Sequence, residues 1–215
     1  MLPSMEKILQ NPLVKWFINI PFLWDIAQNV IGENQWKAVM YPGVIDVKGG
    51  TLLDFGCSIG NETKAFPEYD YYGVDIDQHA IDAAKATFKD TPHVQFFCLD
   101  ITKEPFKPDF FDHILFAGTG HHIPDSELAK IIDALLGQLK VGGQLHFLDH
   151  IRRPGKDGFF AKLIVKIDQG RFIRTEEDYD RYFDPKKYTI THHELKESPN
   201  KLLKLPDFLY IRIVK

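Results

Sequence analysis

Short apolar runs alternate with amphipathic stretches through the middle of the chain, from position 51 to position 149. Each run is bounded by turn residues or charges, which is typical of short buried strands. Strands that alternate with helices form parallel sheets, so we expect these runs to lie side by side in one sheet. The predicted strands are Thr51–Phe55, Tyr71–Asp75, Val94–Cys98, His113–Ala117 and Gln144–Leu148.

Two of the intervening stretches carry apolar residues at helical spacing, so each predicts a helix with one face on the sheet. The first follows Asp77, a suitable helix cap, and its apolar positions are Ala80, Ile81, Ala84 and Phe88. The apolar positions of the second are Leu128, Ile131, Ile132, Leu135, Leu136 and Leu139. We expect the second helix to stop at Lys140–Gly143, where a glycine can take the left-handed conformation that closes a helix.

The length of 215 residues suits one α/β domain. We divide residues 1–215 into an aromatic-rich helical lid (1–49), a core (50–150), an insert (151–187) and a C-terminal part (188–215). The C-terminal part contains two further apolar runs, and these predict strands near Tyr188–Leu195 and Phe208–Val214.

Composition and charge narrow the class of partner. An apolar fraction of 44% and a charged fraction of 26% are typical of globular proteins, and a net charge of −4 disfavours nucleic acid as a partner. The two cysteines, Cys57 and Cys98, form no C-x-x-C pair, and the absence of a signal-peptide pattern makes the cytoplasm the expected location. The longest apolar stretch, 16–24, is shorter than the roughly 20 residues of a membrane span.

The first predicted strand runs into a glycine-bearing turn, Asp54–Asn61, which we interpret as a ligand-binding turn followed by a helix. Glycine at positions 56 and 60 permits close backbone approach, and the start of a helix offers N–H groups to a carboxylate. The dinucleotide fingerprint G-x-G-x-x-G needs glycines at 56, 58 and 61, but positions 58 and 61 are Ser58 and Asn61. The turn is therefore poorly suited to bind a pyrophosphate.

Two carboxylates follow the next two strands. Asp75 lies 19 positions after Gly56, where doubly wound folds hold ribose hydroxyls. Asp100 is suited to accept a hydrogen bond from an adenine amine, and Ile76 to pack against the ring. The fourth strand ends in Ala117 and Gly118, with His121 and His122 soon after, so we expect the reacting centre at this edge. At most one of the two imidazoles is expected to face it, and a structural role for each is equally open.

Taken together, these motifs resemble those of class I S-adenosylmethionine-dependent methyltransferases, over roughly residues 50–150. The resemblance implies a Rossmann-like, mostly parallel seven-stranded sheet with an antiparallel last strand. It also implies S-adenosylmethionine as cofactor, S-adenosylhomocysteine as product, and a small-molecule acceptor. It assigns Asp75 to the ribose, Asp100 and Ile101 to the adenine, Ala117 and Gly118 to the cofactor edge, and to the methionine part Asp54, Gly56, Cys57, Ser58 and Gly60. Ser58 departs from the family, which has a glycine there.

A second resemblance lies in the insert. Residues 168–179 look like the D-x-G-x-x-x-R-x-x-x-x-Y segment of one methyltransferase subgroup, where this region covers the acceptor pocket. It implies that Arg171, Arg174 and Tyr179 contact the substrate. Gln28 and Gly32 are similar, more weakly, to the lid of the same subgroup.

Other interpretations stay open from the sequence. A nicotinamide-dependent oxidoreductase would use the same sheet, and a non-catalytic module would bind the cofactor without turnover. Methylation of nucleic-acid bases is disfavoured, because the fourth predicted strand is not followed by the Asp/Asn-Pro-Pro-aromatic signature of many such enzymes. No histidine spacing indicates a zinc site, so we expect no metal. If the acceptor atom carries a proton, His121 or His122 is the candidate base.

Overall fold

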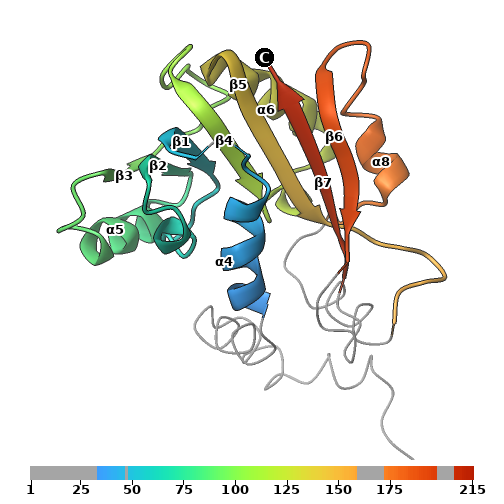
Figure 1. Cartoon of the computed structure of the whole chain (residues 1–215), viewed down its shortest axis with the longest axis horizontal. Helices are drawn as coiled ribbons and strands as arrows, with labels where there is room; N and C mark the ends of the chain where they lie inside the picture. The colour runs from blue at the N-terminus through green and yellow to red at the C-terminus, as the bar shows by residue number, and fades with distance from the viewer. Residues whose placement is uncertain (1–32, 47, 159–171, 198–205) are drawn as a thin grey trace, which may run out of the picture.

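The computed structural model describes residues 33–46, 48–158, 172–197 and 206–215. They form a sheet of seven strands in the order β3-β2-β1-β4-β5-β7-β6 (Figure 1). The strands are β1 (Gly50–Phe55), β2 (Tyr69–Asp75), β3 (Val94–Cys98), β4 (Phe111–Ala117), β5 (Leu139–His150), β6 (Thr189–Lys196) and β7 (Phe208–Val214). All seven predicted strands are present, and the predicted α/β fold class is confirmed.

Strand direction explains where a site can form. The strands from β1 to β5 pair in parallel. Strand β7 inserts between β5 and β6 and is antiparallel to both, so six strands share one direction. The antiparallel last strand is thus as predicted. In this kind of sheet ligands bind at the carboxyl ends of the parallel strands, an edge to which the arrowheads of β4, β5 and β6 point in Figure 1.

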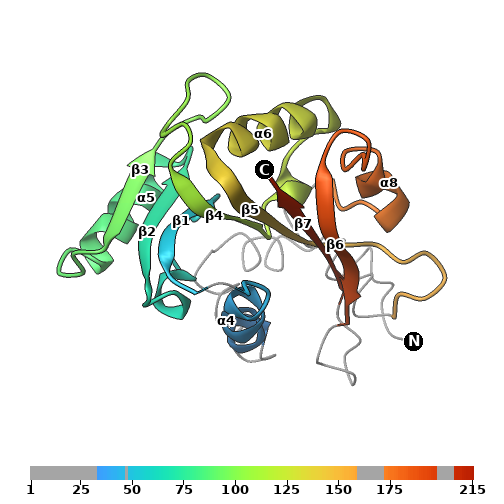
Figure 2. The ribbon, with the colours of Figure 1, turned by 45° about the horizontal axis from the view of Figure 1, so that its top comes forward.

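Helices cover both faces of the sheet, which makes the fold doubly wound. Helices α4 (Glu33–Gly43) and α5 (Gln78–Thr87) lie on one face, and α6 (Asp125–Gln138) and α8 (Glu176–Asp180) on the other (Figure 2). Each face has its own apolar core, with Ile81 and Ala84 of α5 buried in one and Leu128 and Ile132 of α6 in the other. Asp77 caps α5 as predicted, accepting from the amides of His79 and Ala80.

The C-terminal end of α6 was predicted wrongly. The helix stops at Gln138, and residues 139–143 already belong to β5. Leu139 pairs with Phe111 of β4, while the amide of Gly142 donates to the carbonyl of Lys215 beyond β7. Gly142 does adopt a positive φ of 80°, but within a strand and not at a helix end. Pairing on both sides thus outweighs the helical periodicity of this stretch.

The helix expected directly after β1 is also absent from the described chain. The turn leads only into η1 (Thr63–Ala65), a single turn of 3-10 helix. Pro67 follows closely, and a proline lacks the N–H that a continuing helix would need. The predicted helix N-terminus for a carboxylate is therefore not formed.

Helix α4 is attached to the sheet by polar contacts just after it ends. The Tyr210 hydroxyl donates to the Val44 carbonyl at 3.2 Å, and Arg212 pairs with Asp46. Beneath them His146 is fully buried, and burial lowers its pKa to about 3, so the ring is neutral. These contacts fix the position of α4 over the carboxyl edge of the central strands, where the Tyr41 hydroxyl lies close to Gly118.

Candidate active site

The predicted cofactor residues come from four neighbouring strand ends. Asp54 belongs to β1 and Asp75 ends β2, while Asp100 follows β3 and Ala117 ends β4. Because these strands are parallel and adjacent in the order β3-β2-β1-β4, their carboxyl ends meet at one edge of the sheet. The structure therefore brings the sequence-predicted residues together. Which ligand they contact stays a prediction.

The turn after β1 is held in left-handed backbone conformation at three positions. Gly56, Ser58 and Gly60 have φ angles of 78°, 48° and 80°. A side chain at Gly56 would collide with Thr119, and one at Gly60 would collide with Phe96. The glycines thus allow close packing within the protein. Ser58 is held in a conformation costing roughly 1–2 kcal/mol for a residue with a Cβ, which explains why a glycine suits this position.

Asp75 organises this turn from the neighbouring strand. Its Oδ2 accepts from the amide of Ser58 at 2.9 Å, and its Oδ1 accepts from the amide of Asp77 at 3.0 Å. A carboxylate has about four lone-pair sites, so both oxygens retain capacity for a ligand. Ile76 beside it is 76% exposed, and exposed apolar surface at a strand end suits the face of a planar ring.

Asp100 is engaged in its own turn. Its Oδ1 accepts from the amide and hydroxyl of Thr102, and its Oδ2 pairs with Lys103 at 3.1 Å. The Thr102 and Lys103 contacts lower the pKa of Asp100, so the group is a carboxylate. Ile101 next to it is buried.

Three charged side chains gather behind the turn, of which sequence reasoning singled out only Asp54. Asp54 is buried and accepts a short hydrogen bond from the Tyr71 hydroxyl. Burial raises its pKa to about 6, although the Tyr71 bond opposes the rise. Burial, and next the charge of Asp54, raise the pKa of Glu62 to about 7, while Lys37 of α4 lowers it less. This cluster lies between the turn and α4.

The two histidines after β4 differ in their surroundings. His121 is 4% exposed, and its Nδ1 lies 2.5 Å from Oδ1 of Asp149 at the end of β5. His122 is exposed, and its ring lies 4.2 Å from that of His121 between centroids. His121 thus has a buried carboxylate partner.

The predicted substrate residues of the insert lie next to this pair. Tyr179 is fully buried and its hydroxyl donates to Oδ2 of Asp149 at 2.6 Å. Arg174 is 4% exposed and donates to the carbonyls of Gly120 and Ile123. Both side chains are therefore engaged within the protein, and contact with a substrate stays a prediction. Arg171 lies outside the described residues, as do Gln28 and Gly32.

Sequence reasoning missed Asp149 as a site residue, along with Glu62 and Lys37. The sequence could have indicated Asp149, because it lies at the carboxyl end of the fifth parallel strand, as Asp75 does at the end of the second. No such position in the sequence indicates Glu62 or Lys37, because neither lies at the end of a strand of the sheet.

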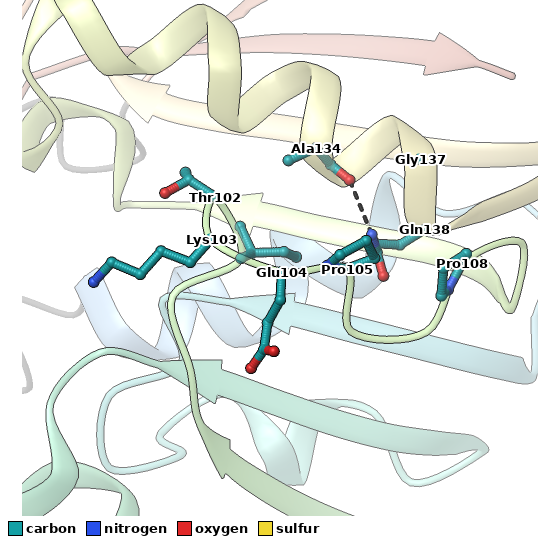
Figure 3. Close-up of a pocket in the computed structure, with 9 residues that line it drawn as sticks. Thr102, Lys103, Glu104, Pro105, Pro108, Ala134, Gly137 and Gln138 are labelled. Carbon is teal, nitrogen blue, oxygen red and sulfur yellow. Dashed lines mark hydrogen bonds between the residues drawn. The ribbon is translucent and has the colours of Figure 1, made fainter.

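A separate hollow of about 310 Å³ lies between the loop after β3 and the C-terminal half of α6. Figure 3 shows Gln138 at its wall, donating to the carbonyl of Ala134. Lys103 and Glu104 at its rim are exposed, and none of its lining residues is a histidine or cysteine. The hollow therefore lacks the chemistry of the edge described above.

Two further properties concern only the residues that the structure describes. Within residues 33–46, 48–158, 172–197 and 206–215, no three histidine, cysteine or acidic side chains are grouped so that they could bind a metal ion. In the same ranges no helix combines the length and apolar character of a membrane span.

Comparison with known proteins points in one direction. Residues 52–143 match the model of a family described as a methyltransferase domain. A SAM-dependent methyltransferase from Aquifex aeolicus has a similar structure, with a TM-score of 0.64 and 16% identity over 100% of both chains. Phosphoethanolamine N-methyltransferase 2 of Haemonchus contortus, solved with S-adenosyl-L-methionine, gives a TM-score of 0.66 and 17% identity over 100% of this chain and 60% of its own.

The same fold also occurs in a protein named for a different reaction. The [4+2]-cyclase SpnF superposes with a TM-score of 0.67 and 16% identity, over 85% of this chain and 81% of its own. No curated protein matches the sequence. Likeness at these identities establishes the fold, while the reaction has to be argued from the site.

Proposed function

We propose that the protein methylates a small molecule with His121 as proton acceptor. Residues 52–143 match the model of a methyltransferase domain, and structures of S-adenosylmethionine-dependent methyltransferases share the fold. The observation that carries this proposal is the His121 ring, bonded to buried Asp149 beside the strand ends that hold the cofactor motifs. A hydroxyl or ammonium acceptor is the class that such a base would serve.

The residues at the edge fit the cofactor. Asp75 presents two carboxylate oxygens that suit the two ribose hydroxyls, and the exposed Ile76 suits the adenine ring. Asp54 and Glu62 offer negative charge to the ammonium of the methionine part, and Lys37 offers positive charge to its carboxylate. Asp100, Ala117 and Gly118 keep the roles that the family motif implies.

Two features favour a small acceptor. The chain has a net charge of −4, which gives no general attraction for a nucleic acid, and α4 already packs over the carboxyl edge, with Tyr41 close to Gly118. A structural neighbour, phosphoethanolamine N-methyltransferase 2, is by its name an enzyme for a small amine. We keep the cytoplasm as the expected location.

Methyl transfer from an activated donor requires few catalytic side chains. S-adenosylmethionine, when bound, supplies an activated methyl group. The chain's own task is to hold the acceptor atom at a near-attack distance of about 3 Å and to take up its proton. A neutral imidazole at His121 can do so near physiological pH, with Asp149 stabilising the imidazolium that forms.

Two alternatives make different predictions. Because a protein named as a [4+2]-cyclase shares this fold, one alternative is a protein that binds the cofactor without methyl transfer. A nicotinamide-dependent oxidoreductase would bind NAD⁺, although Ser58 and Asn61 break the glycine fingerprint.

Calorimetric titration with S-adenosylmethionine, S-adenosylhomocysteine and NAD⁺ separates these functions. We expect the first two to bind, and Asp75→Ala to weaken both by at least about 100-fold, because two hydrogen bonds to a charged group contribute roughly 1.5–3 kcal/mol each, or about 3 kcal/mol or more together. Asp82→Ala, on an exposed position of α5, is the matched control and should bind like the wild type.

Binding of NAD⁺ alone would replace the proposal with an oxidoreductase. Undiminished binding in Asp75→Ala would remove the assignment of the ribose site. Where the sulfonium compound binds, release of S-adenosylhomocysteine across a panel of phenols, alcohols and amines tests turnover. No release with any acceptor would favour the non-catalytic module.

A further inference from the structure

A buried polar network joins the loop after β4, the end of β5 and the segment 172–179. We infer that Asp149, Tyr179 and Arg174 are positioning residues that hold the His121 ring with its proton on Nδ1, so that Nε2 is the proton-accepting nitrogen. This inference rests on the proposed function, in which His121 takes up the acceptor's proton. It assigns to Arg174 and Tyr179 a role that acts through His121.

Asp149 is the centre of the network. Its side chain is fully buried, and its Oδ1 lies 2.5 Å from His121 Nδ1 and 2.9 Å from the amide of His150. Burial alone would raise the pKa of Asp149, but the charge and hydrogen bond of His121 and the bond from Tyr179 lower it overall. The group is therefore a carboxylate and can only accept, so a neutral His121 must donate through Nδ1–H.

Tyr179 fixes the other oxygen of the same carboxylate. Its hydroxyl donates to Asp149 Oδ2 at 2.6 Å. Burial and the neighbouring charge of Asp149 raise the pKa of the Tyr179 phenol, so the hydroxyl keeps its proton and acts as a donor. With a donor on each oxygen, the carboxylate is prevented from rotating, and its direction fixes the plane in which His121 can lie.

The loop that carries His121 fits closely over this carboxylate. A Cβ at Gly120 would lie 2.5 Å from Asp149 Oδ2 and 3.0 Å from the ring of Phe147. Only a residue without a side chain allows the loop to come so near. Glycine at position 120 is thus a requirement of the His121–Asp149 contact itself.

Arg174 holds the same loop from the other side. Its guanidinium donates to the carbonyls of Gly120 at 3.0 Å and Ile123 at 2.7 Å, and to Asp125 Oδ1 at 2.6 Å. The amide of Phe172 donates to the carbonyl of His121 at 3.0 Å. Gly120 and Ile123 on either side of His121, and the carbonyl of His121 itself, are therefore bonded to residues 172–174 of the insert.

Within the described part of the chain, titratable and charged groups approach His121 from three elements. His122 lies beside it on the same turn, and Asp149 and His150, whose ring centroid is 5.8 Å away, come from β5. Tyr179 of α8 and Arg174 before it act through Asp149 and Gly120. Among these groups Asp149 carries the negative charge, which favours a proton on the His121 ring.

Nitrogen NMR of ¹⁵N-histidine-labelled protein tests the inference without any ligand. The chain has nine histidines, and the His121 signals are those that disappear in His121→Asn, with His122→Asn as the control that leaves them. We expect His121 to be the Nδ1–H tautomer. Asp149→Asn should lower its proton affinity by at least about 10-fold, because the removed charge is adjacent.

Tyr179→Phe should act in the opposite direction. Removing one donor makes the Asp149 carboxylate more basic, so the proton affinity of His121 should rise by about 3-fold to 10-fold. A merely structural role predicts no such opposed pair of shifts. If Asp149→Asn does not fold, Tyr179→Phe carries the test alone.

An Nε2–H tautomer in the wild type, or shifts in the same direction in both variants, would overturn the inference. Loss of S-adenosylmethionine binding with the expected NMR result would instead overturn only the proposed function. The two failures are therefore distinguishable.

Discussion

The strongest quantitative prediction concerns Glu62, the carboxyl group between Asp54 and Lys37. Burial and the charge of Asp54 raise its pKa from 4.5 to about 7. Below pH 4.5 the group is protonated in both the folded and unfolded chains, and it contributes no difference. Between pH 4.5 and about pH 7, Glu62 is ionised in the unfolded chain but still mostly protonated in the folded one. Glu62 therefore lowers the free energy of unfolding progressively as the pH rises to about 7.

The size of the effect follows from the shift. A rise in the pKa of Glu62 from 4.5 to about 7 corresponds to a loss of roughly 3.4 kcal/mol in the free energy of unfolding. Because Glu62 keeps partial contact with solvent, which screens its charge, we expect about 2 kcal/mol. Glu62→Gln removes the ionisation and leaves the shape almost unchanged. The variant should therefore match the wild type most closely near pH 4.5 and gain about 2 kcal/mol relative to it by pH 8.

Urea unfolding followed by far-UV circular dichroism, at steps between about pH 4.5 and pH 8, measures this difference directly. Glu68→Gln is the matched control, because Glu68 is an exposed carboxylate on the same stretch of chain. Its difference from the wild type should stay constant with pH. A constant difference for Glu62→Gln as well, or one that falls as the pH rises, would refute the reasoning.

Two further predictions follow from backbone and side-chain contacts. Gly56→Ala and Gly142→Ala share a left-handed φ, of 78° and 80°, but a new Cβ at 142 meets nothing within 4 Å, whereas one at 56 collides with Thr119. Unfolding by urea should show a loss of about 1–2 kcal/mol for Gly142→Ala and about 1–3 kcal/mol more for Gly56→Ala; equal losses would contradict the role of Thr119. Arg174→Lys cannot keep the forked contacts of the guanidinium and should lose about 2–3 kcal/mol, while Arg181→Lys, with a side chain 75% exposed, should change by less than about 0.5 kcal/mol. A loss in Arg174→Lys no larger than in Arg181→Lys would show that the fork contributes little.

The strands were predictable because each is a short apolar run closed by turn residues. The runs Val94–Cys98 and Phe208–Val214 were predicted with the bounds that the structure has. Strand β5 begins earlier than its apolar run suggested, since Leu139 also continues the helical spacing of α6. Pairing with β4 decides its conformation, and this pairing is not visible in local sequence.

Strand order was enough to predict that Asp54, Asp75 and Asp100 lie at one edge of the sheet, but the network around His121 was not predictable. Asp149 lies 28 residues from His121 and 30 residues from Tyr179, so no local spacing connects the three. The insert was expected to reach the acceptor with Arg174 and Tyr179. That contact stays a prediction, but both side chains are buried, because the carbonyls of the loop after β4 and the Asp149 carboxylate need donors that water cannot supply there.

The amide of Arg152 donates to the carbonyl of Arg174 at 2.8 Å, so the chain that leaves the sheet after β5 comes back to a point just beyond the end of that strand. The intervening stretch, residues 153–173, therefore has its two ends fixed next to each other. Its length can then vary at low cost, about 0.6 kcal/mol for each doubling. Grafting a stretch of different length between these two arginines should therefore leave the seven-stranded sheet intact.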